Sequence, residues 1–300
     1  MSSVAKPVLP AEPALSPRSN SETAQVLAPV IWFGLLLVLC YLPILILLVN
    51  QWSNDEDMGH GFFVPIVAGY IAWQRKDELA GIESRPNYLG LALIIYAAFQ
   101  GWIGTLGAEL FLARTAFVEA VVGTVLYLGG WKALRILAFP LSLLVFMIPI
   151  PAVIYNQITF PLQLFASRVA ADLLDLIGIP VLREGNVLEL PSQKLSVVEA
   201  CSGIRSLLSL TFLSLVYAYF FDNKTWMRWA LLIATVPIAI AANAFRVTVT
   251  GIMSEIDTEL AHGFMHTAQG WVIFMIALAI LVGVHQLIDR IYKKVVRRAS

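Results

Sequence analysis

Residues 31–49 read IWFGLLLVLCYLPILILLV, an apolar run that contains no charged side chain. The hydrocarbon core of a bilayer is spanned by about 20 such residues in a helix. The rest of the chain has the same character, because 59% of all residues are hydrophobic, 13% are charged and the mean hydropathy is +0.78. Soluble domains carry about twice that share of charge. The apolar run and the composition together predict the fold class: an all-α polytopic membrane protein.

Other apolar stretches extend this pattern to about eight transmembrane helices. The expected spans are 26–49, 60–74, 88–105, 109–129, 133–151, 201–221, 227–250 and 264–288. Residues 1–24 are rich in Pro, Ser and Ala, which predicts a disordered tail. Residues 25–291 then form a single transmembrane domain, and residues 292–300 form a basic tail.

A longer insert at 152–200 separates the fifth span from the sixth. Its first half, 154–178, carries charges such as Asp172 on an apolar pattern, so a short interfacial or re-entrant helix is expected there. Its second half, 180–198, has alternating and β-branched residues around Gly185, which predicts a small β-hairpin outside the bilayer.

The Lys and Arg residues indicate how the chain is oriented. Most of them precede the first span, follow the eighth, or lie in the loops after the second, fourth and sixth spans. Cytoplasmic loops are enriched in these residues. We therefore expect both termini in the cytoplasm, and the 152–200 insert on the outer face of the cytoplasmic (inner) membrane.

Composition also excludes several classes of function. The formal net charge is zero, so no bulk electrostatic attraction to nucleic acid is implied. The two cysteines, Cys40 and Cys201, make neither a disulfide framework nor a structural zinc site.

The two thiols differ in their sequence surroundings. Cys40 lies inside the first apolar run, whereas Cys201 begins the sixth span between Glu199 and Arg205. A helix N-terminus favours the thiolate, and an arginine one turn further on acts in the same direction. The residues alone leave two interpretations of Cys201: a nucleophile or a small buried side chain.

A second polar side chain lies at the outer end of the seventh span. Arg246 follows Asn243 by one helical turn and comes after a fully apolar stretch. Arginine is costly at membrane depth, so such a residue is usually paired or functional. Snorkelling of the side chain to the interface is the alternative.

Three histidines fall at outer helix ends. His262 and His266, spaced i, i+4 at the start of the eighth span, suit general acid–base chemistry. A metal pair with Glu259 is a weaker alternative, because Gly263 stands where H-E-x-x-H motifs have a glutamate. A structural histidine is the third interpretation, and His60 is either a supporting or a packing residue.

Four segments together resemble the exosortase/archaeosortase family. The stretches EACSGIR at 199–205, NAFR at 243–246 and GFMHTAQGW at 263–271 resemble, in order, its three signature segments. The stretch GHGFFVP at 59–65 is similar to its amino-terminal motif. The resemblance covers about residues 52–291, and its specificity comes from the combination of short motifs.

The resemblance implies a membrane-embedded cysteine peptidase or transpeptidase. Its catalytic set would be Cys201 as nucleophile, Arg246 as oxyanion or substrate stabiliser and His266 as general acid and base. Supporting residues would be Glu199, Arg205, Asn243, His262 and His60. No cofactor or metal is implied.

The partners implied are exported proteins with a carboxy-terminal sorting signal, typically a Pro-Glu-Pro-type motif, one apolar helix and a basic tail. Membrane lipid surrounds the enzyme, and no nucleic acid is involved. Two rival functions remain at this point. One is a non-enzymatic transporter or assembly component of an exopolysaccharide or protein export system, and the other is a metal-dependent protease built on His262 and His266.

Overall fold

The computed structural model describes residues 20–82, 86–197, 203–222, 224–258 and 263–299, most of which are helical. Among them, five helices are long and apolar enough to cross a bilayer: Pro29–Asn54, Tyr88–Leu106, Leu110–Met147, Thr225–Ile256 and Ala268–Val296. The helix Ser206–Phe221 is apolar but shorter. The expected all-α multi-pass class is confirmed, and the count of eight spans stays a prediction.

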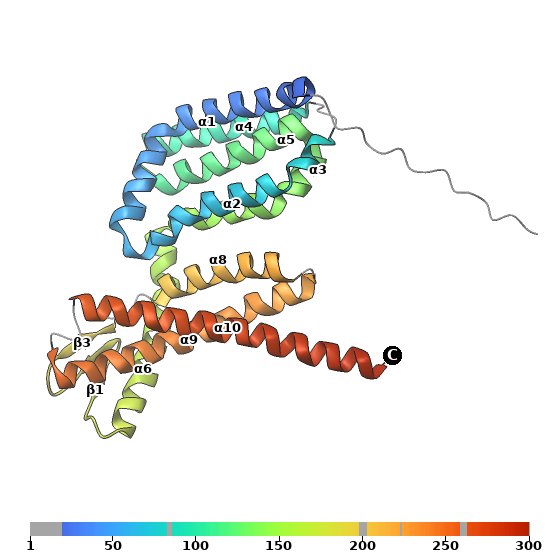
Figure 1. The fold of residues 1–300 in the computed structure, drawn as a ribbon. Coiled ribbons are helices and arrows are strands. Elements are labelled where there is room, and N and C mark those ends of the chain that lie inside the picture. Colours follow the sequence, from blue (N-terminus) through green and yellow to red (C-terminus); the bar gives the residue numbers. More distant parts are fainter. Residues whose placement is uncertain (1–19, 83–85, 198–202, 223, 259–262, 300) are drawn as a thin grey trace, which may run out of the picture.

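The first half of the chain forms the upper helix group in Figure 1. Its elements are α1 (Asn20–Asn54), the 3-10 helix η1 (Glu56–Phe62), α2 (Phe63–Gln74), α3 (Lys76–Ala80), α4 (Tyr88–Leu106) and α5 (Leu110–Leu143). Because α1 begins at Asn20, the end of the expected disordered tail belongs to a helix.

The long range α5 contains a reversal of the chain at Gly130. This residue has a φ of 63° and a ψ of −165°, a backbone conformation that glycine adopts without steric cost. The two halves of α5 run back along each other, as the green segments in Figure 1 show. Gly130 falls in the gap between the two helices expected at 109–129 and 133–151, although the second one ends at Leu143 and a 3-10 helix follows it to Met147.

The second half of the chain forms the lower group. It follows η2 (Leu144–Met147) and consists of α6 (Ala152–Leu176), three short strands, α8 (Gly203–Phe221), α9 (Thr225–Ile256) and α10 (Gly263–Ala299). The expected short interfacial helix is thus 25 residues long. It runs across the direction of α8, α9 and α10, as Figure 1 shows.

A three-stranded antiparallel sheet follows α6. Its strands are β1 (Leu182–Glu184), β2 (Val187–Glu189) and β3 (Lys194–Ser196), in that spatial order. The expected hairpin is β1–β2, which turns at Gly185 with a φ of 65°. The third strand was not expected, and the side of the membrane on which the sheet lies stays a prediction.

The sheet is anchored to α6 by polar contacts and to both α6 and α9 by apolar ones. Ser167 Oγ donates to Gly185 O at 2.9 Å, and Asn186 Nδ2 donates to Gln163 Oε1 at 3.2 Å. The apolar contacts form one buried cluster that the sheet region shares with α9, and its members include Leu188, Leu195, Val197, Ala244 and Val247. The sheet therefore has a defined place on the lower group.

The two helix groups meet where α8 lies against α2, α5 and the 3-10 helices. The ring of Phe139 stacks on that of Tyr219 with centroids 4.3 Å apart, and Arg75 Nε donates to the Tyr219 hydroxyl at 3.0 Å. At the other end of this junction, Trp52 Nε1 donates to Met147 O at 3.0 Å. Aromatic packing and the Arg75–Tyr219 bond thus join the groups, and the Trp52 bond ties α1 to η2, which connects them.

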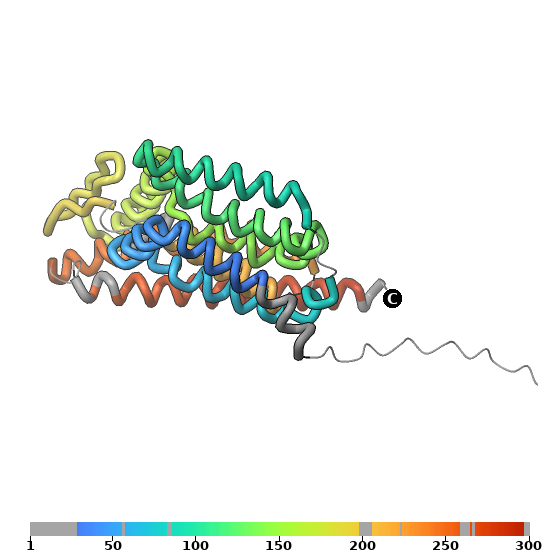
Figure 2. The backbone as a smooth tube through the Cα atoms, turned by 90° about the horizontal axis from the view of Figure 1, so that it is seen from above, coloured from blue at the N-terminus to red at the C-terminus, as the bar shows by residue number. Residues whose placement is uncertain are grey.

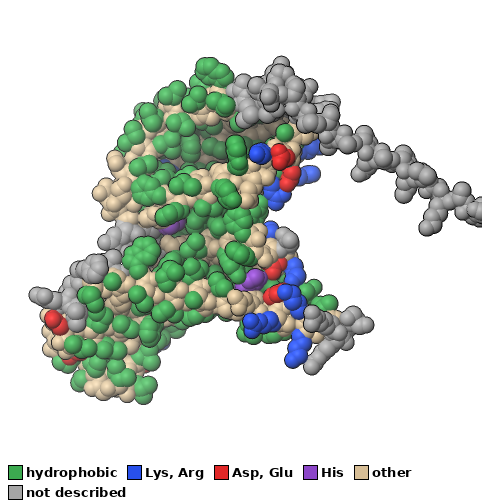
Figure 3. Space-filling model, in the orientation of Figure 1, with side chains coloured by type: hydrophobic (Ala, Val, Ile, Leu, Met, Phe, Trp, Pro, Cys, Tyr) green, Lys and Arg blue, Asp and Glu red, His purple; other side chains and the backbone are tan. Residues whose placement is uncertain are grey.

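The two ends of the molecule differ in charge. Exposed apolar side chains cover the flanks, as expected for surfaces that contact lipid, whereas Lys and Arg gather near the end of α10 (Figure 3). α1 begins and α10 ends at this same end, and the sheet lies at the opposite end in both ribbon and tube views (Figures 1 and 2). This arrangement agrees with two termini on one side of a membrane.

Candidate functional site

The structure describes only part of the expected catalytic set. Cys201, Glu199 and His262 lie outside the described residues. Arg205 and His266 occupy helical positions in α8 and α10, and the description does not extend to their side chains. Arg246, Asn243 and His60 are described with their surroundings, and the site is built from them.

Arg246 is a buried charge in the middle of a continuous helix. Its exposed fraction is 8%, and that of Asn243, one turn earlier on α9, is 5%. An arginine withdrawn from water in this way is usually paired or functional. Arg246 packs inside the lower group, which favours the paired or functional interpretation over a side chain that snorkels to the membrane interface.

The guanidinium of Arg246 lies against the backbone of α10. A Cβ placed on Gly270 would lie 3.0 Å from Nη2 and 3.1 Å from Cζ of Arg246. Only glycine leaves that space open without displacing the guanidinium. Position 266 is one helical turn before Gly270, so it belongs to the same face of α10. The helix register thus brings position 266 towards Arg246.

Gln269 fixes this helix contact. Its Nε2 donates to Arg246 O at 3.0 Å, and its side-chain amide also bonds to Thr250 Oγ1 at 3.1 Å. In the sequence, Gln269 could have been noticed as a polar side chain next to Gly270 in an otherwise apolar stretch. Sequence reasoning assigned it no role, because the bond joins residues 23 positions apart.

The start of α8 reaches α9 beside Asn243. Leu207 of α8 and Leu162 of α6 line a small cavity together with Ala239, Ile240 and Asn243 of α9. Leu207 comes two residues after Arg205, so the first turns of α8 lie at the level of Asn243. Three of the sequence segments that carry the motifs therefore converge on one region: the start of α8, the middle of α9 and the start of α10.

The sheet borders the same region. Leu195 and Val197, on and just after β3, pack in one cluster with Ala244 and Val247, which flank Arg246 on α9. On the exposed side of the sheet, Lys194 pairs with Glu189. The hydrogen bond that Lys194 donates to this carboxylate raises the pKa of Lys194.

The ring of His60 is held by hydrogen bonds to two other elements. Its Nε2 lies 3.1 Å from Phe146 O, and its Nδ1 lies 3.4 Å from Ser209 Oγ. A carbonyl only accepts hydrogen bonds, so Nε2 donates and, in the neutral ring, Nδ1 accepts from the serine hydroxyl. The ring thereby connects η1, η2 and α8. This favours the packing interpretation of His60 over a role in the chemistry.

Gly61, next to His60, is required for packing. A Cβ at Gly61 would lie 2.5 Å from Trp52 Nε1, whereas one at Gly59 would meet nothing within 4 Å. The indole therefore lies directly on Gly61 while it donates to Met147 O. The 59–65 motif positions the entrance of α2 against η2.

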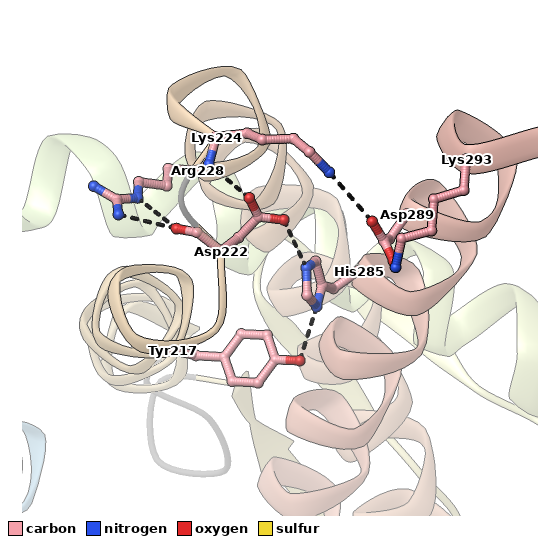
Figure 4. Close-up of polar contacts among 7 residues, drawn as sticks. All are labelled: Tyr217, Asp222, Lys224, Arg228, His285, Asp289 and Lys293. Carbon is pink, nitrogen blue, oxygen red and sulfur yellow. Dashed lines mark hydrogen bonds and ion pairs between the residues drawn. The ribbon is translucent and has the colours of Figure 1, made fainter. Parts of the chain in front are cut away.

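A second polar cluster lies at the carboxy-terminal end of α8, beside the interior of α10. The Tyr217 hydroxyl lies 2.9 Å from His285 Nδ1, and His285 Nε2 lies 3.2 Å from Asp222 Oδ2 (Figure 4). His285 is 15 residues beyond Gly270 on α10, or about 22 Å along the helix. The cluster is therefore separate from the Arg246 region.

The same cluster closes the turn between α8 and α9. Lys224 N donates to Asp222 Oδ1 at 2.7 Å, and the guanidinium of Arg228 donates to Asp222 O. Lys224 Nζ pairs with Asp289 Oδ1 of α10 at 3.3 Å (Figure 4). These contacts join α8, α9 and α10 at one end of the lower group. Sequence reasoning found neither Tyr217 nor Asp222.

Two charged residues, Arg114 and Glu119, lie within the apolar first half of α5. Arg114 is buried, with 5% of its surface exposed. Gln100 Nε2 of α4 donates to Thr115 Oγ1 at 2.9 Å and lies 3.4 Å from Glu119 Oε1. Glu119 thus takes part in the pairing of α4 with α5.

Comparison with known families gives one match. The family model described as transmembrane exosortase (Exosortase_EpsH) matches residues 52–283. No curated protein and no solved structure matches the chain. The matched range includes the motif segments on α8, α9 and α10 and also His60 with its two hydrogen-bond partners.

Proposed function

The chain belongs to the transmembrane exosortase family, and from this premise we propose that it is a cysteine peptidase or transpeptidase of exported proteins. Its substrates are proteins with a carboxy-terminal sorting signal, and Cys201 is the nucleophile. The observation that carries the proposal is the burial of Arg246 against Gly270. A fixed positive charge there faces the helix that holds position 266.

The convergence of three segments supports a shared site. Arg246 is buried on α9, the start of α8 borders Asn243, and Gln269 ties α10 to Arg246 O. On α8 and α10, these contacts are made by Leu207 and Gln269, which lie close in sequence to Cys201 and His266. The proposal places the two reactive side chains around Arg246 on that basis.

The reaction proceeds through a thioester. The thiolate of Cys201 attacks the scissile carbonyl carbon, and the positive charge of Arg246 stabilises the oxyanion that develops. The C–N bond breaks as His266 gives a proton to the leaving amine. Water or an amine then attacks the thioester, His266 takes back a proton, and the thiolate is released.

The membrane orientation is part of the proposal. Both termini lie in the cytoplasm and the Arg246 region faces the outside of the inner membrane, where an exported protein presents its sorting signal. The basic side chains near the end of α10 support this orientation, because cytoplasmic ends are enriched in Lys and Arg (Figure 3).

Processing of a co-expressed reporter tests the proposal. The reporter is an exported domain followed by a Pro-Glu-Pro motif, an apolar helix and a basic tail. Cys201→Ala should abolish its cleavage, whereas Cys40→Ala should leave it intact, because Cys40 lies exposed on α1. Equal cleavage by the two variants, read by mass spectrometry of the reporter, would contradict the assignment of the nucleophile.

A further inference from the structure

β3 forms one edge of the sheet. It pairs with β2 alone, with Leu188 opposite Leu195 and Val187 opposite Ser196. Two backbone hydrogen bonds flank this ladder: Leu190 N donates to Gln193 O at 2.9 Å, and Val197 N donates to Asn186 O at 3.0 Å.

The direction of the remaining backbone groups follows from this register. In an antiparallel pair, hydrogen-bonded and non-hydrogen-bonded positions alternate. Gln193, Leu195 and Val197 therefore turn their backbone groups towards β2. The N–H and C=O groups of Lys194 and Ser196 point the other way, to the open edge of the sheet.

This edge has no partner within the part of the chain that the structure describes. No hydrogen bond from the backbone of Lys194 or Ser196 to another described element is present. Lys194 is exposed and Ser196 is half-buried. A row of unpaired N–H and C=O groups is a template for a further strand.

The edge leads along α9 towards Arg246. Before β3, Ser192 Oγ donates to Glu255 Oε1 of α9 at 2.6 Å. At its other end, Val197 belongs to the same buried cluster as Val247, which is next to Arg246. The sheet region thus lies against α9 between Glu255 and Arg246, with Val197 towards Arg246.

We propose that the open edge of β3 binds an extended segment of the protein substrate by strand addition and directs it to the Arg246 region. The proposal rests on the proposed function. The occupant is the substrate and not a second copy of the chain, because the edge leads to the candidate site. Four backbone groups on two residues also suit a transient complex better than a stable dimer.

Strand addition has a consequence for specificity. Backbone bonds hold any extended segment, whatever its side chains, while alternate side chains enter pockets. The β3 edge therefore contributes affinity and direction, and recognition of the sorting motif falls to side chains elsewhere in the site.

Proline substitution at the edge tests this inference in the purified full-length protein. Ser196→Pro removes an outward N–H and keeps the ladder to β2, because that N–H is not part of the ladder. We expect KM for the reporter about three- to tenfold above that of Ser196→Ala, with the same kcat. Equal KM values for the two variants would overturn the inference.

A matched control uses the other edge of the same sheet. Arg183 of β1 lies opposite Leu188 and turns its N–H away from β2. Arg183→Pro should therefore leave KM within about twofold of the wild-type value. A rise equal to that of Ser196→Pro would show a general effect on the sheet and would overturn the role of the β3 edge.

Amide hydrogen exchange keeps the inference testable if Ser196→Pro does not fold. In Cys201→Ala, the intact reporter should slow exchange at Lys194 and Ser196 more than at Leu195, whose N–H already bonds to β2. Unchanged exchange at both residues overturns strand addition. Exchange at these residues that slows without the reporter, and slows further as the protein concentration rises, would indicate that a second copy of the chain binds the edge. That result would also overturn the inference.

The two proposals fail in different ways. Cleavage of the reporter by Cys201→Ala at the wild-type rate contradicts the proposed function, whatever happens at the edge. Cleavage that depends on Cys201 but has equal KM in Ser196→Pro and Ser196→Ala overturns strand addition alone.

Discussion

The guanidinium of Arg246 occupies the place that a side chain at Gly270 would take: a Cβ there would lie 3.0 Å from Nη2. Glycine at this position is therefore a requirement of the contact between α9 and α10, and no positive φ is involved. In the 263–271 motif of α10, Gly270 leaves room for the guanidinium of Arg246, and Gln269 bonds to Arg246 O.

Gly270→Val should displace the guanidinium and lower the rate of reporter cleavage by about 10²-fold, because displacements of about 1 Å have effects of that size. Gly270→Ala should have a smaller effect, since its Cβ demands a shift of only a few tenths of an ångström. The measurement is kcat for the purified variants.

The control for this series lies on the same helix. A Cβ at Gly283 would meet nothing within 4 Å, so Gly283→Val brings the same residue into open space. It should retain wild-type kcat. Equal losses in the two valine variants would mean that helix propensity, and not the Arg246 contact, decides the effect.

Gln269→Glu should destabilise the protein more than Gln269→Leu. A carboxylate cannot donate to Arg246 O and brings a charge to a site where the amide Nε2 now donates. The leucine variant loses the bonds alone, at about 1 kcal/mol each. Thermal unfolding in detergent checks the order of the two variants, and the reverse order would argue against Nε2 as the donor.

Gly61→Ala should lower the free energy of unfolding by about 1–3 kcal/mol, the usual range for overpacking. Its Cβ would lie 2.5 Å from Trp52 Nε1, and the indole is buried. Gly59→Ala, two residues earlier, meets open space and should be close to neutral. Chemical denaturation of both variants tests this, and similar stabilities would show that the indole moves aside freely.

Tyr217→Phe should reduce stability by about 1 kcal/mol and leave reporter cleavage unchanged. It removes the hydroxyl that lies 2.9 Å from His285 Nδ1, about 22 Å along α10 from Gly270 (Figure 4). The comparison of unfolding midpoint with kcat separates the two effects. A loss of kcat at unchanged stability would show that the cluster acts in the reaction.

Hydropathy predicted the helices well because lipid imposes a long apolar run on each of them. The span expected at 88–105 is α4, Tyr88–Leu106, and that expected at 201–221 is α8, Gly203–Phe221. The helices α9 and α10 continue beyond their expected ends at 250 and 288, to Ile256 and Ala299. A helix does not have to end where its side chains become polar, so hydropathy alone underestimates its length.

The site was harder to predict than the helices. Arg246 could be selected because a charge within an apolar helix stands out in sequence. The bond of Gln269 to Arg246 O and the place of His285 beside Tyr217 depend on how separate helices pack. β3 was missed for a similar reason, since its place in the sheet depends on backbone pairing with β2 and not on its own three residues.

The central claim is that Cys201 forms a thioester with the substrate, and peptide mass spectrometry of the rapidly acid-quenched enzyme tests it most directly. With the reporter present, the account predicts an adduct on the peptide that contains Cys201, equal in mass to the substrate fragment before the scissile bond, and none in Cys201→Ala. Cleavage of the reporter by Cys201→Ala, or the same adduct on Cys40, would contradict it.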